Sequence, residues 1–306
     1  MFIATCVMYS CGDDILNDIE YGSTNIIEED TLSPSEVDTT YIPNENELPD
    51  SVDIEHVEVD TAYVLNTDTA PTSNEDSIQL DLEIPRLTKD MPEQILKRIG
   101  YTVSYNITTK NPNWVAWVLT KDHTTGPINR IDGYDNDYTI YGYQPKEKDW
   151  DDMPDTLSHG HMCPAADNKW NRQAMEQSTL LSNICPQAKN LNSGSWNKLE
   201  GKCRDWAEKY DSIYIVCGPV FYSDSIKTMG AAKIWVPDAF YKVVLCMTGK
   251  PKAIGFIYTN DNLSHNMQKS VRSVAEIEAL TGIDFFCSLP DEIEYSIEAS
   301  AYFNAW

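Results

Sequence analysis

The chain has 306 residues, which is enough for one large domain or two of ordinary size. Its formal net charge of −25 argues at first sight against a polyanionic partner, but residues 12–85 alone hold 21 Asp and Glu and no Lys or Arg. The rest of the chain holds 27 acidic and 23 basic residues, so that part can present a local basic patch to a nucleic acid. Overall charge therefore does not exclude a nucleic-acid function.

The N-terminal residues point to export. Residues 1–10 are mostly apolar and end in Ser10, and Cys11 follows directly. This arrangement is similar to the end of a bacterial lipoprotein signal peptide, which predicts a lipid on Cys11. The protein would then be anchored at the cell envelope or surface, or else be periplasmic or secreted; the alternative is an N-terminus without a targeting role. No later segment approaches the roughly 18–20 apolar residues of a membrane-spanning helix.

Residues 12–94 are predicted to form an acidic tether. They combine high net charge with few apolar side chains, and proline occurs at positions 34, 43, 49, 71 and 85. Such a composition favours disorder. The segment would either hold a domain at 95–306 away from a surface or be a solvated leader with no further task.

Six cysteines lie in the remaining part, at positions 163, 185, 203, 217, 246 and 287. An even number permits disulfides in an oxidising compartment, but the sequence does not choose among the pairings. The paired CxxC spacing of a structural zinc site is missing from this set. Buried free thiols are the alternative.

Secondary-structure signals begin at about residue 95. Residues 101–109 alternate apolar and polar side chains, Asn111–Asn113 suggests a turn, and residues 114–120 are rich in Trp and Val, which together predict a hairpin. Further strands are predicted at 213–220, 240–247 and 253–258, and helices at 171–181, 194–209 and 270–281. Strands mixed irregularly with a few helices favour an α+β fold over a regular βαβ repeat.

The residues suited to catalysis are concentrated in residues 155–206. Two of the five histidines, His159 and His161, lie near its start, and Asn192 stands at the N-cap position of a predicted helix. Glu200 and Arg204 are four residues apart on this helix and share one face. The apolar stripe of the helix is formed by Trp196, Leu199, Cys203 and Trp206. A base, a neutral oxygen ligand, a carboxylate and a guanidinium are what metal-assisted phosphodiester hydrolysis requires.

Three blocks in this span resemble the DNA/RNA non-specific endonuclease family, whose members have a ββα-metal core. Residues 158–167 (Ser-His-Gly-His-Met-Cys-Pro-Ala-Ala-Asp) are similar to its Asp-Arg-Gly-His motif. Residues 182–187 match its Ser-Asn-x-x-Pro-Gln block, and residues 192–200 match its Asn-x-Gly-x-Trp-x-x-Leu-Glu block. The similarity extends over roughly residues 95–295. Ser158 and His159 replace the family's Asp and Arg, so a permanent cation is lost at this position.

The resemblance implies a fold and a mechanism. The fold would have a central antiparallel β-sheet with flanking helices and a ββα-metal active site. His161 would be the general base, and the amide oxygen of Asn192 would ligate Mg²⁺, with Mn²⁺ able to substitute. Glu200 would position water beside the ion.

Phosphate binding and substrate range are also implied by the resemblance. Arg204 or the upstream Arg130 would brace the phosphate. Supporting roles would fall to Ser158, His159, Asn183 and Gln187. The substrates would be DNA and RNA, single- or double-stranded, with 5′-phosphate ends on the products. Contacts confined to phosphate would give little sequence preference.

Other functions stay open from the residues alone. His159, His161 and Cys163 alternate along an extended segment, so all three could bind zinc structurally. The domain would then be a surface-exposed binding module without activity. A toxin nuclease held by an immunity protein is a third possibility. Asn192 by itself could be a plain helix cap, and Glu200 with Arg204 an ordinary surface pair.

Overall fold

The computed structural model describes residues 81–222 and 224–306. The predicted signal segment 1–11, with Cys11, and the predicted tether up to residue 80 lie outside these residues. The central element is an antiparallel sheet in the order β12-β11-β10-β7-β4-β3-β2. Its strands are β2 (Gln94–Lys97), β3 (Thr102–Asn106), β4 (Asn111–Thr120), β7 (Ser212–Val220), β10 (Ala239–Cys246), β11 (Lys252–Thr259) and β12 (Val271–Arg272).

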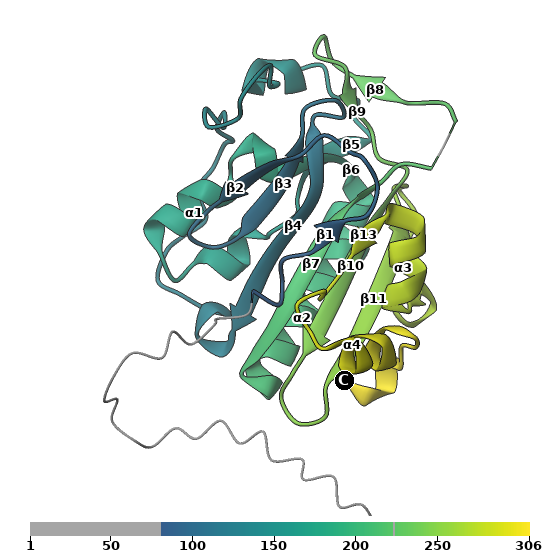
Figure 1. The fold of residues 1–306 in the computed structure, drawn as a ribbon. Helices are drawn as coiled ribbons and strands as arrows, with labels where there is room; N and C mark the ends of the chain where they lie inside the picture. The colour runs from purple at the N-terminus through teal and green to yellow at the C-terminus, as the bar shows by residue number, and fades with distance from the viewer. Residues whose placement is uncertain (1–80, 223) are drawn as a thin grey trace, which may run out of the picture. The chain divides into compact units, whose positions relative to one another are not determined.

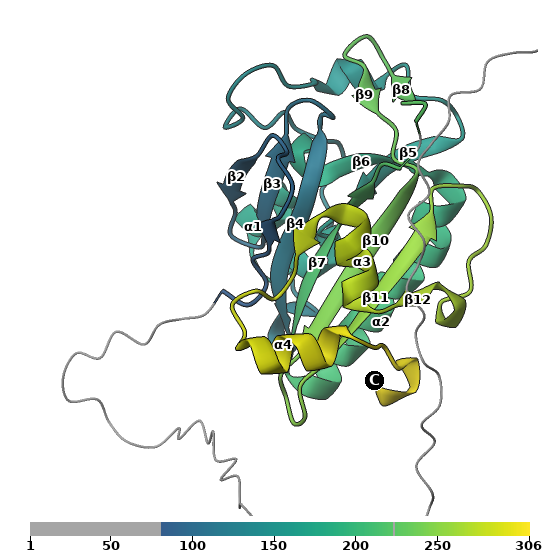
Figure 2. The same cartoon turned by 45° about the vertical axis from the view of Figure 1, so that its right-hand side comes forward.

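Helices cover both faces of this sheet. Figures 1 and 2 show α2 on one face and α3 with α4 on the other. The α-helices are α1 (Arg172–Ser178), α2 (Asn197–Tyr210), α3 (Val274–Thr281) and α4 (Asp291–Glu298). Short antiparallel pairs are formed by β1 (Arg86–Leu87) with β13 (Ile283–Asp284), β5 (Leu157–His161) with β6 (Ile184–Ala188), and β8 (Thr228–Met229) with β9 (Ile234–Trp235). The predicted α+β fold with a central antiparallel sheet is thus confirmed.

Side-chain alternation along the strands explains why both faces need a cover. On β10, Phe240 and Val244 pack on the α2 side, whereas Tyr241 and Val243 pack on the side of α3, and all four are fully buried. Fully burying an apolar side chain of this size contributes about 1.5–3 kcal/mol. A strand that is apolar on both faces is stable only inside a layered structure.

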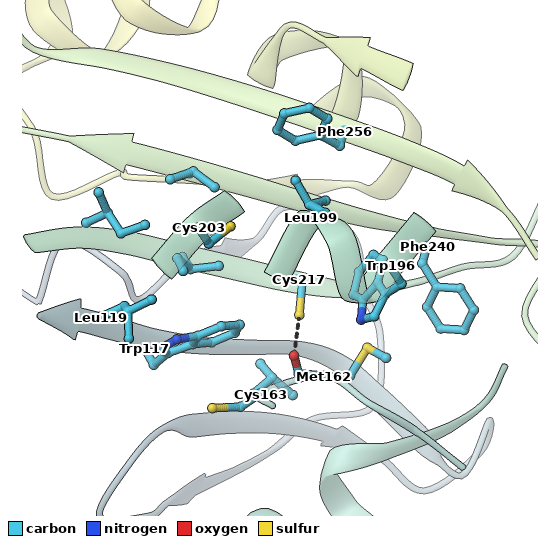
Figure 3. Close-up of a cluster of buried hydrophobic side chains, with 14 of the residues drawn as sticks. Trp117, Leu119, Met162, Cys163, Trp196, Leu199, Cys203, Cys217, Phe240 and Phe256 are labelled. Carbon is cyan, nitrogen blue, oxygen red and sulfur yellow. Dashed lines mark hydrogen bonds between the residues drawn. The ribbon is translucent and has the colours of Figure 1, made fainter. Parts of the chain in front are cut away.

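The core beneath α2 also holds the segment that follows β5 (Figure 3). Met162 and Cys163 are fully buried there, and the thiol of Cys217 on β7 donates a hydrogen bond to the carbonyl of Met162 at 3.3 Å. The indole of Trp196 donates to the carbonyl of His161 at 3.3 Å. The end of β5 is therefore fixed to both the sheet and the beginning of α2.

The predicted hairpin is present, but its turn lies earlier than predicted. Asn111–Asn113 belongs to β4, and the chain reverses between Asn106 and Asn111. The side chain of Asn106 accepts hydrogen bonds from the backbone N–H groups of Thr108 and Thr109, which closes the turn locally. Pro112 is tolerated in the strand because it lies at a register irregularity opposite Tyr105.

The later strands agree with the predictions, whereas the helices differ at one end: the helix predicted at 171–181 is α1, which already ends at Ser178, and the other two start later than predicted. The three strands predicted after residue 210 are found as β7, β10 and β11, each within one residue of its predicted ends. A π-helical turn, Leu191–Trp196, precedes α2, so Asn192 lies inside this turn and is not the N-cap residue. The helix predicted from residue 270 begins only at Val274, because Ser273 and Glu276 form a capping box.

The folded region begins before the predicted boundary at residue 95. Leu82 is buried, β1 pairs with β13, and β2 begins at Gln94. The last residues of the expected tether therefore belong to the domain. Leu82 packs in the hydrophobic core, and β1 pairs with β13, which lies near the C-terminal end of the domain.

Two further expectations concern cysteines and membrane helices. The cysteines of the described residues, Cys163, Cys185, Cys203, Cys217, Cys246 and Cys287, are all free thiols, and all but Cys287 are buried. This is the buried-thiol alternative, since each packs as a small apolar side chain. Among the helices that the structure describes, none is long and apolar enough to cross a membrane.

Candidate active site

A two-stranded ribbon followed by a helix forms the framework of the site. Strands β5 and β6 pair antiparallel, with His161 opposite Ile184, and the chain then passes through the π turn into α2. The side chain of Asn260 secures this ribbon, since it accepts from the backbone of Ala188 at 2.7 Å and donates to Pro186 at 3.1 Å. The order strand, strand, helix is the ββα arrangement that the sequence resemblance implied.

Asn183 holds the chain where it leaves β5. Its amide oxygen accepts from the N–H of Cys163 at 2.9 Å, and its amide nitrogen donates to the carbonyls of Cys163 and Ser178 at 2.8 Å each. Asn183 is fully buried. Its predicted role as a supporting hydrogen-bonding residue agrees with these contacts.

Gln187 packs against the neighbouring strand β5. Neither atom of its buried amide has a hydrogen-bond partner among the described residues. Its side chain instead covers Gly160, where an added Cβ would lie 2.5 Å from the amide oxygen and 2.6 Å from the Cβ of Gln187. Gln187 therefore supports the ribbon by packing, and position 160 accepts only glycine without a shift of its neighbour.

His161 is buried and chemically available. The residue is 9% exposed, and its Nε2 atom has no hydrogen-bond partner among the described residues. Burial, with smaller contributions from Arg130 and His159, lowers the pKa of His161 to about 3. In the folded chain the imidazole is therefore in its neutral form at neutral pH.

Asn192 presents its amide oxygen as a free ligand atom. Its amide nitrogen donates to the hydroxyl of Ser158 at 3.0 Å and to the carbonyl of His159 at 3.2 Å. The hydroxyl of Ser158 in turn donates to the carbonyl of Gln187 at 3.1 Å. Since no described residue donates to the amide oxygen of Asn192, the orientation of this side chain fits an oxygen ligand for a hard cation.

One cavity of about 450 Å³ brings the main predicted residues together. Arg130, His161, Asn192 and Glu200 all line it, although they come from an irregular segment, β5, the π turn and α2. Its other lining residues are Pro164, Ala165, Ala166, Lys169, Ser193 and Asn197. The sequence offered Arg130 and Arg204 as alternatives for phosphate, and only Arg130 reaches this cavity.

Arg204 belongs to a buried ion pair. Its guanidinium donates to the carboxylate of Asp167 at 2.8 Å, and the indole of Trp117 donates to the other carboxylate oxygen at 3.2 Å. Arg204 is absent from the cavity lining. The expectation that Arg204 braces phosphate is therefore not supported, because Asp167 on the segment after β5 already pairs with it.

Lys242 is a residue of the site that the sequence analysis did not single out. It is 1% exposed, and its ammonium lies 4.9 Å and 4.5 Å from the ring centres of Trp117 and Trp196. Burial raises the pKa of Glu200 to about 7, and Lys242 is the largest influence opposing that rise. The available signal was the two-residue period of β10. Lys242 lies two residues from both Phe240 and Val244, so its side chain is on the same α2 face of the sheet.

The zinc site suggested by the sequence is not formed. In the described part of the chain, no group of three or more His, Cys, Asp or Glu side chains is placed to hold a metal ion. Strand β5 ends at His161, so the alternation does not continue to Cys163. The thiol of Cys163 lies in the core cluster of Figure 3 and accepts a hydrogen bond from Asn168.

The sequence profile of the DNA/RNA non-specific endonuclease family matches residues 80–292 of this chain. The chain belongs to this family. The match starts at the beginning of the described residues and includes the ribbon, the π turn and α2. Within the endonuclease family, this chain departs from the common motif at Ser158, which contacts Asn192, and at His159, whose ring stacks between two aromatic side chains.

Several nucleases are similar to this endonuclease-family chain. The mitochondrial nuclease EXOG of Danio rerio is 32% identical over 212 residues, which cover 62% of this chain and 60% of the relative. Nuclease C1 of Cunninghamella echinulata is 31% identical over 219 residues, covering 63% and 83%. The chain thus spans about three-fifths of the length of the EXOG relative.

A solved structure supports the fold. The EndoG/EndoGI complex contains a chain that superposes with a TM-score of 0.63 at 21% sequence identity, covering 69% of this chain and 91% of that one. At this identity the similarity concerns the fold, which is the ββα-metal fold.

Proposed function

We propose that this protein is a metal-dependent endonuclease that hydrolyses phosphodiester bonds of DNA and RNA. The observation that carries the proposal is the 450 Å³ cavity in which His161, Asn192, Glu200 and Arg130 meet. His161 lines this cavity, and its buried Nε2 atom has no hydrogen-bond partner among the described residues. Membership in the endonuclease family supports the same reaction.

The residues of the cavity fit a divalent cation. The amide oxygen of Asn192 is the candidate protein ligand, since its nitrogen is bound to Ser158 and His159. Mg²⁺ commonly takes few protein ligands and completes its shell with water and substrate oxygens, and Mn²⁺ accepts the same donors. When bound, the ion would supply positive charge against the phosphate and the leaving oxygen.

The side chains of the protein would perform the remaining work. Neutral His161 would accept a proton from the attacking water at Nε2. The guanidinium of Arg130 would donate hydrogen bonds to phosphate oxygens, and its charge is permanent. Glu200 would accept a hydrogen bond from water in the cavity and orient it. Asp167 and Arg204 would hold α2 against the segment after β5.

The substrate range follows from what these groups would contact. The proposed roles of Arg130, Asn192 and His161 involve the phosphate group and not the base edges. Contacts to phosphate carry no sequence information. We therefore expect single- and double-stranded DNA and RNA to be cut with little sequence preference and with 5′-phosphate ends on the products. We also propose export with lipid attachment at Cys11, on the grounds of residues 1–11.

The test uses the full chain on plasmid DNA and on RNA, first in EDTA and then with Mg²⁺ or Mn²⁺. Wild type should degrade both only with the metal, and His161→Ala should lower kcat by about 10²-fold or more. His123→Ala is the matched control, because His123 stacks on Trp170 and does not line the cavity. Both substrates left intact by wild type with either metal between about pH 6 and 9 would reject the proposal.

A further inference from the structure

The imidazole of His159 is enclosed by two aromatic rings. The ring of Tyr134 stacks on it with centres 4.1 Å apart and an interplanar angle of 12°, and the ring of Trp150 does so at 4.7 Å and 23°. No ring contact joins Tyr134 to Trp150 in the described residues, so the two rings occupy opposite faces of His159.

Tyr134 lies in a segment with little regular structure, and Trp150 ends the 3₁₀ turn that follows this segment. Between the short 3₁₀ turns Lys121–His123 and Glu147–Trp150, the described residues form no helix and only a single isolated β-bridge, at Asp135. Side-chain contacts must therefore fix much of this segment. Arg130, the one arginine that lines the catalytic cavity, lies in it.

Tyr134 connects the stack to the catalytic groups. Its ring centre is 5.6 Å from that of His161. Burial raises the pKa of Tyr134, and the nearby guanidinium of Arg130, which lines the same cavity, opposes that rise. A second cavity of about 290 Å³ is lined by Arg130, Tyr134, His159 and Asn192, so these side chains form one continuous wall beside the site.

We propose that His159 is a positioning residue. Its ring, stacked between Tyr134 and Trp150, fixes Tyr134 and thereby holds Arg130 at the catalytic cavity. The proposal rests on the proposed nuclease function. Position 159 acts through its ring contacts with Tyr134 and Trp150. The backbone carbonyl of His159 also accepts from the amide of Asn192, so one residue is in contact with both the phosphate-binding segment and the metal ligand.

The kinetic test compares His159→Ala with His159→Phe in the full chain, each with and without Arg130→Ala. Because a misplaced substrate-binding group can cost on the order of 10²-fold, His159→Ala should lower kcat/KM by roughly 10- to 100-fold. His159→Phe keeps a planar ring and should stay within about fivefold of wild type. In the Arg130→Ala background, His159→Ala should lower kcat/KM by less than about threefold more.

A purely structural role for His159 predicts a different pattern. Its loss would then reduce kcat/KM by the same factor whether or not Arg130 is present, and this result would overturn the proposal. Trp150→Leu provides a second variant if His159→Ala fails to fold, because it removes the ring on the opposite face from Tyr134. It should show the same dependence on Arg130.

A measurement without activity separates this proposal from the nuclease function. In EDTA, trypsin should cleave after Arg130 about three to ten times faster in His159→Ala than in wild type or His159→Phe. His123→Ala, which loses a comparable stack on Trp170 (4.0 Å, 8°), should not have this effect. If wild type shows no nuclease activity but trypsin still cleaves His159→Ala faster than wild type, only the nuclease function is rejected. An active wild type with equal cleavage in all variants would reject only the stack.

Discussion

At the scale of single residues, burial shifts the pKa values of His161 and Glu200, which both line the cavity. Removing a side chain from water disfavours its charged form, so the same cause lowers the pKa of His161 to about 3 and raises that of Glu200 to about 7. The histidine is therefore a proton acceptor at neutral pH. Glu200 titrates near neutrality, with the nearby cations Lys242, Arg204 and Arg130 favouring its ionised form.

The raised pKa of Glu200 predicts a pH-dependent cost in the metal-free protein. Its folded pKa of about 7 lies above the ordinary value of 4.5, so the folded state binds this proton more tightly than the unfolded state. The resulting stabilisation is complete below about pH 4.5 and is lost as the pH rises through about 7. Glu200→Gln should therefore be more stable than wild type at pH 8 by on the order of 2 kcal/mol, with little difference near pH 5.

Thermal unfolding in EDTA at several pH values measures this difference. Added Mg²⁺ should reduce it, because a nearby cation favours the ionised carboxylate. A difference between the two proteins that is the same at pH 5 and pH 8 would contradict the assigned environment of Glu200.

At the scale of elements, the ribbon and α2 convert distant sequence positions into one site. His161 ends β5, Asn192 lies in the π turn, and Glu200 lies in the first turn of α2. The π turn displaces Asn192 from the cap position, so that its side chain reaches back to Ser158 and the carbonyl of His159. A regular α-helical start would leave this amide bonded to its own helix terminus.

The close contact between the two strands of the ribbon predicts that Gly160→Ala is destabilising. The new Cβ would lie 2.5 Å from the side chain of Gln187, so the strands must separate slightly, at a cost of about 1–3 kcal/mol. The activity should fall as well, since His161 follows directly. Gly194→Ala is the matched control, because its added Cβ would meet nothing within 4 Å, and its effect should stay within about 0.5 kcal/mol.

Urea unfolding of both variants checks this prediction. Equal stabilities for Gly160→Ala and Gly194→Ala would show that Gln187 moves aside without cost, and that it does not support the ribbon.

At the scale of the whole molecule, the domain closes on itself through its N-terminal residues. Leu82 packs in the core on the α3 side, and β1 pairs with β13 near the other end of the domain. The family profile also begins at residue 80. Composition could not place this boundary, because residues 81–85 still belong to the stretch without Lys or Arg, whereas Leu82 is buried in the domain.

Anchoring of the whole protein is predicted by Cys11. Expressed with its native N-terminus in a bacterium that processes lipoproteins, wild type should fractionate with membranes, since a lipid chain gains about 0.8 kcal/mol per buried CH₂ group. Cys11→Ser should move most of the protein to the soluble fraction. Cys6→Ser is the matched control within the same apolar segment. Identical fractionation of wild type and Cys11→Ser would contradict lipid attachment at this residue.

The sequence by itself determined the fold class and the long strands, and it suggested His161 and Asn192 as site residues, which line one cavity in the structure. Strand periodicity and spaced motifs are local properties of the chain, so they are readable without coordinates. Only the tertiary structure decided that Arg130 and not Arg204 lines the cavity, that Lys242 is buried near Trp117 and Trp196, and that Cys163 lies in the hydrophobic core. These placements depend on contacts between side chains of different helices and strands. Such contacts, and the burial that results from them, cannot be read from the spacing of residues along the chain.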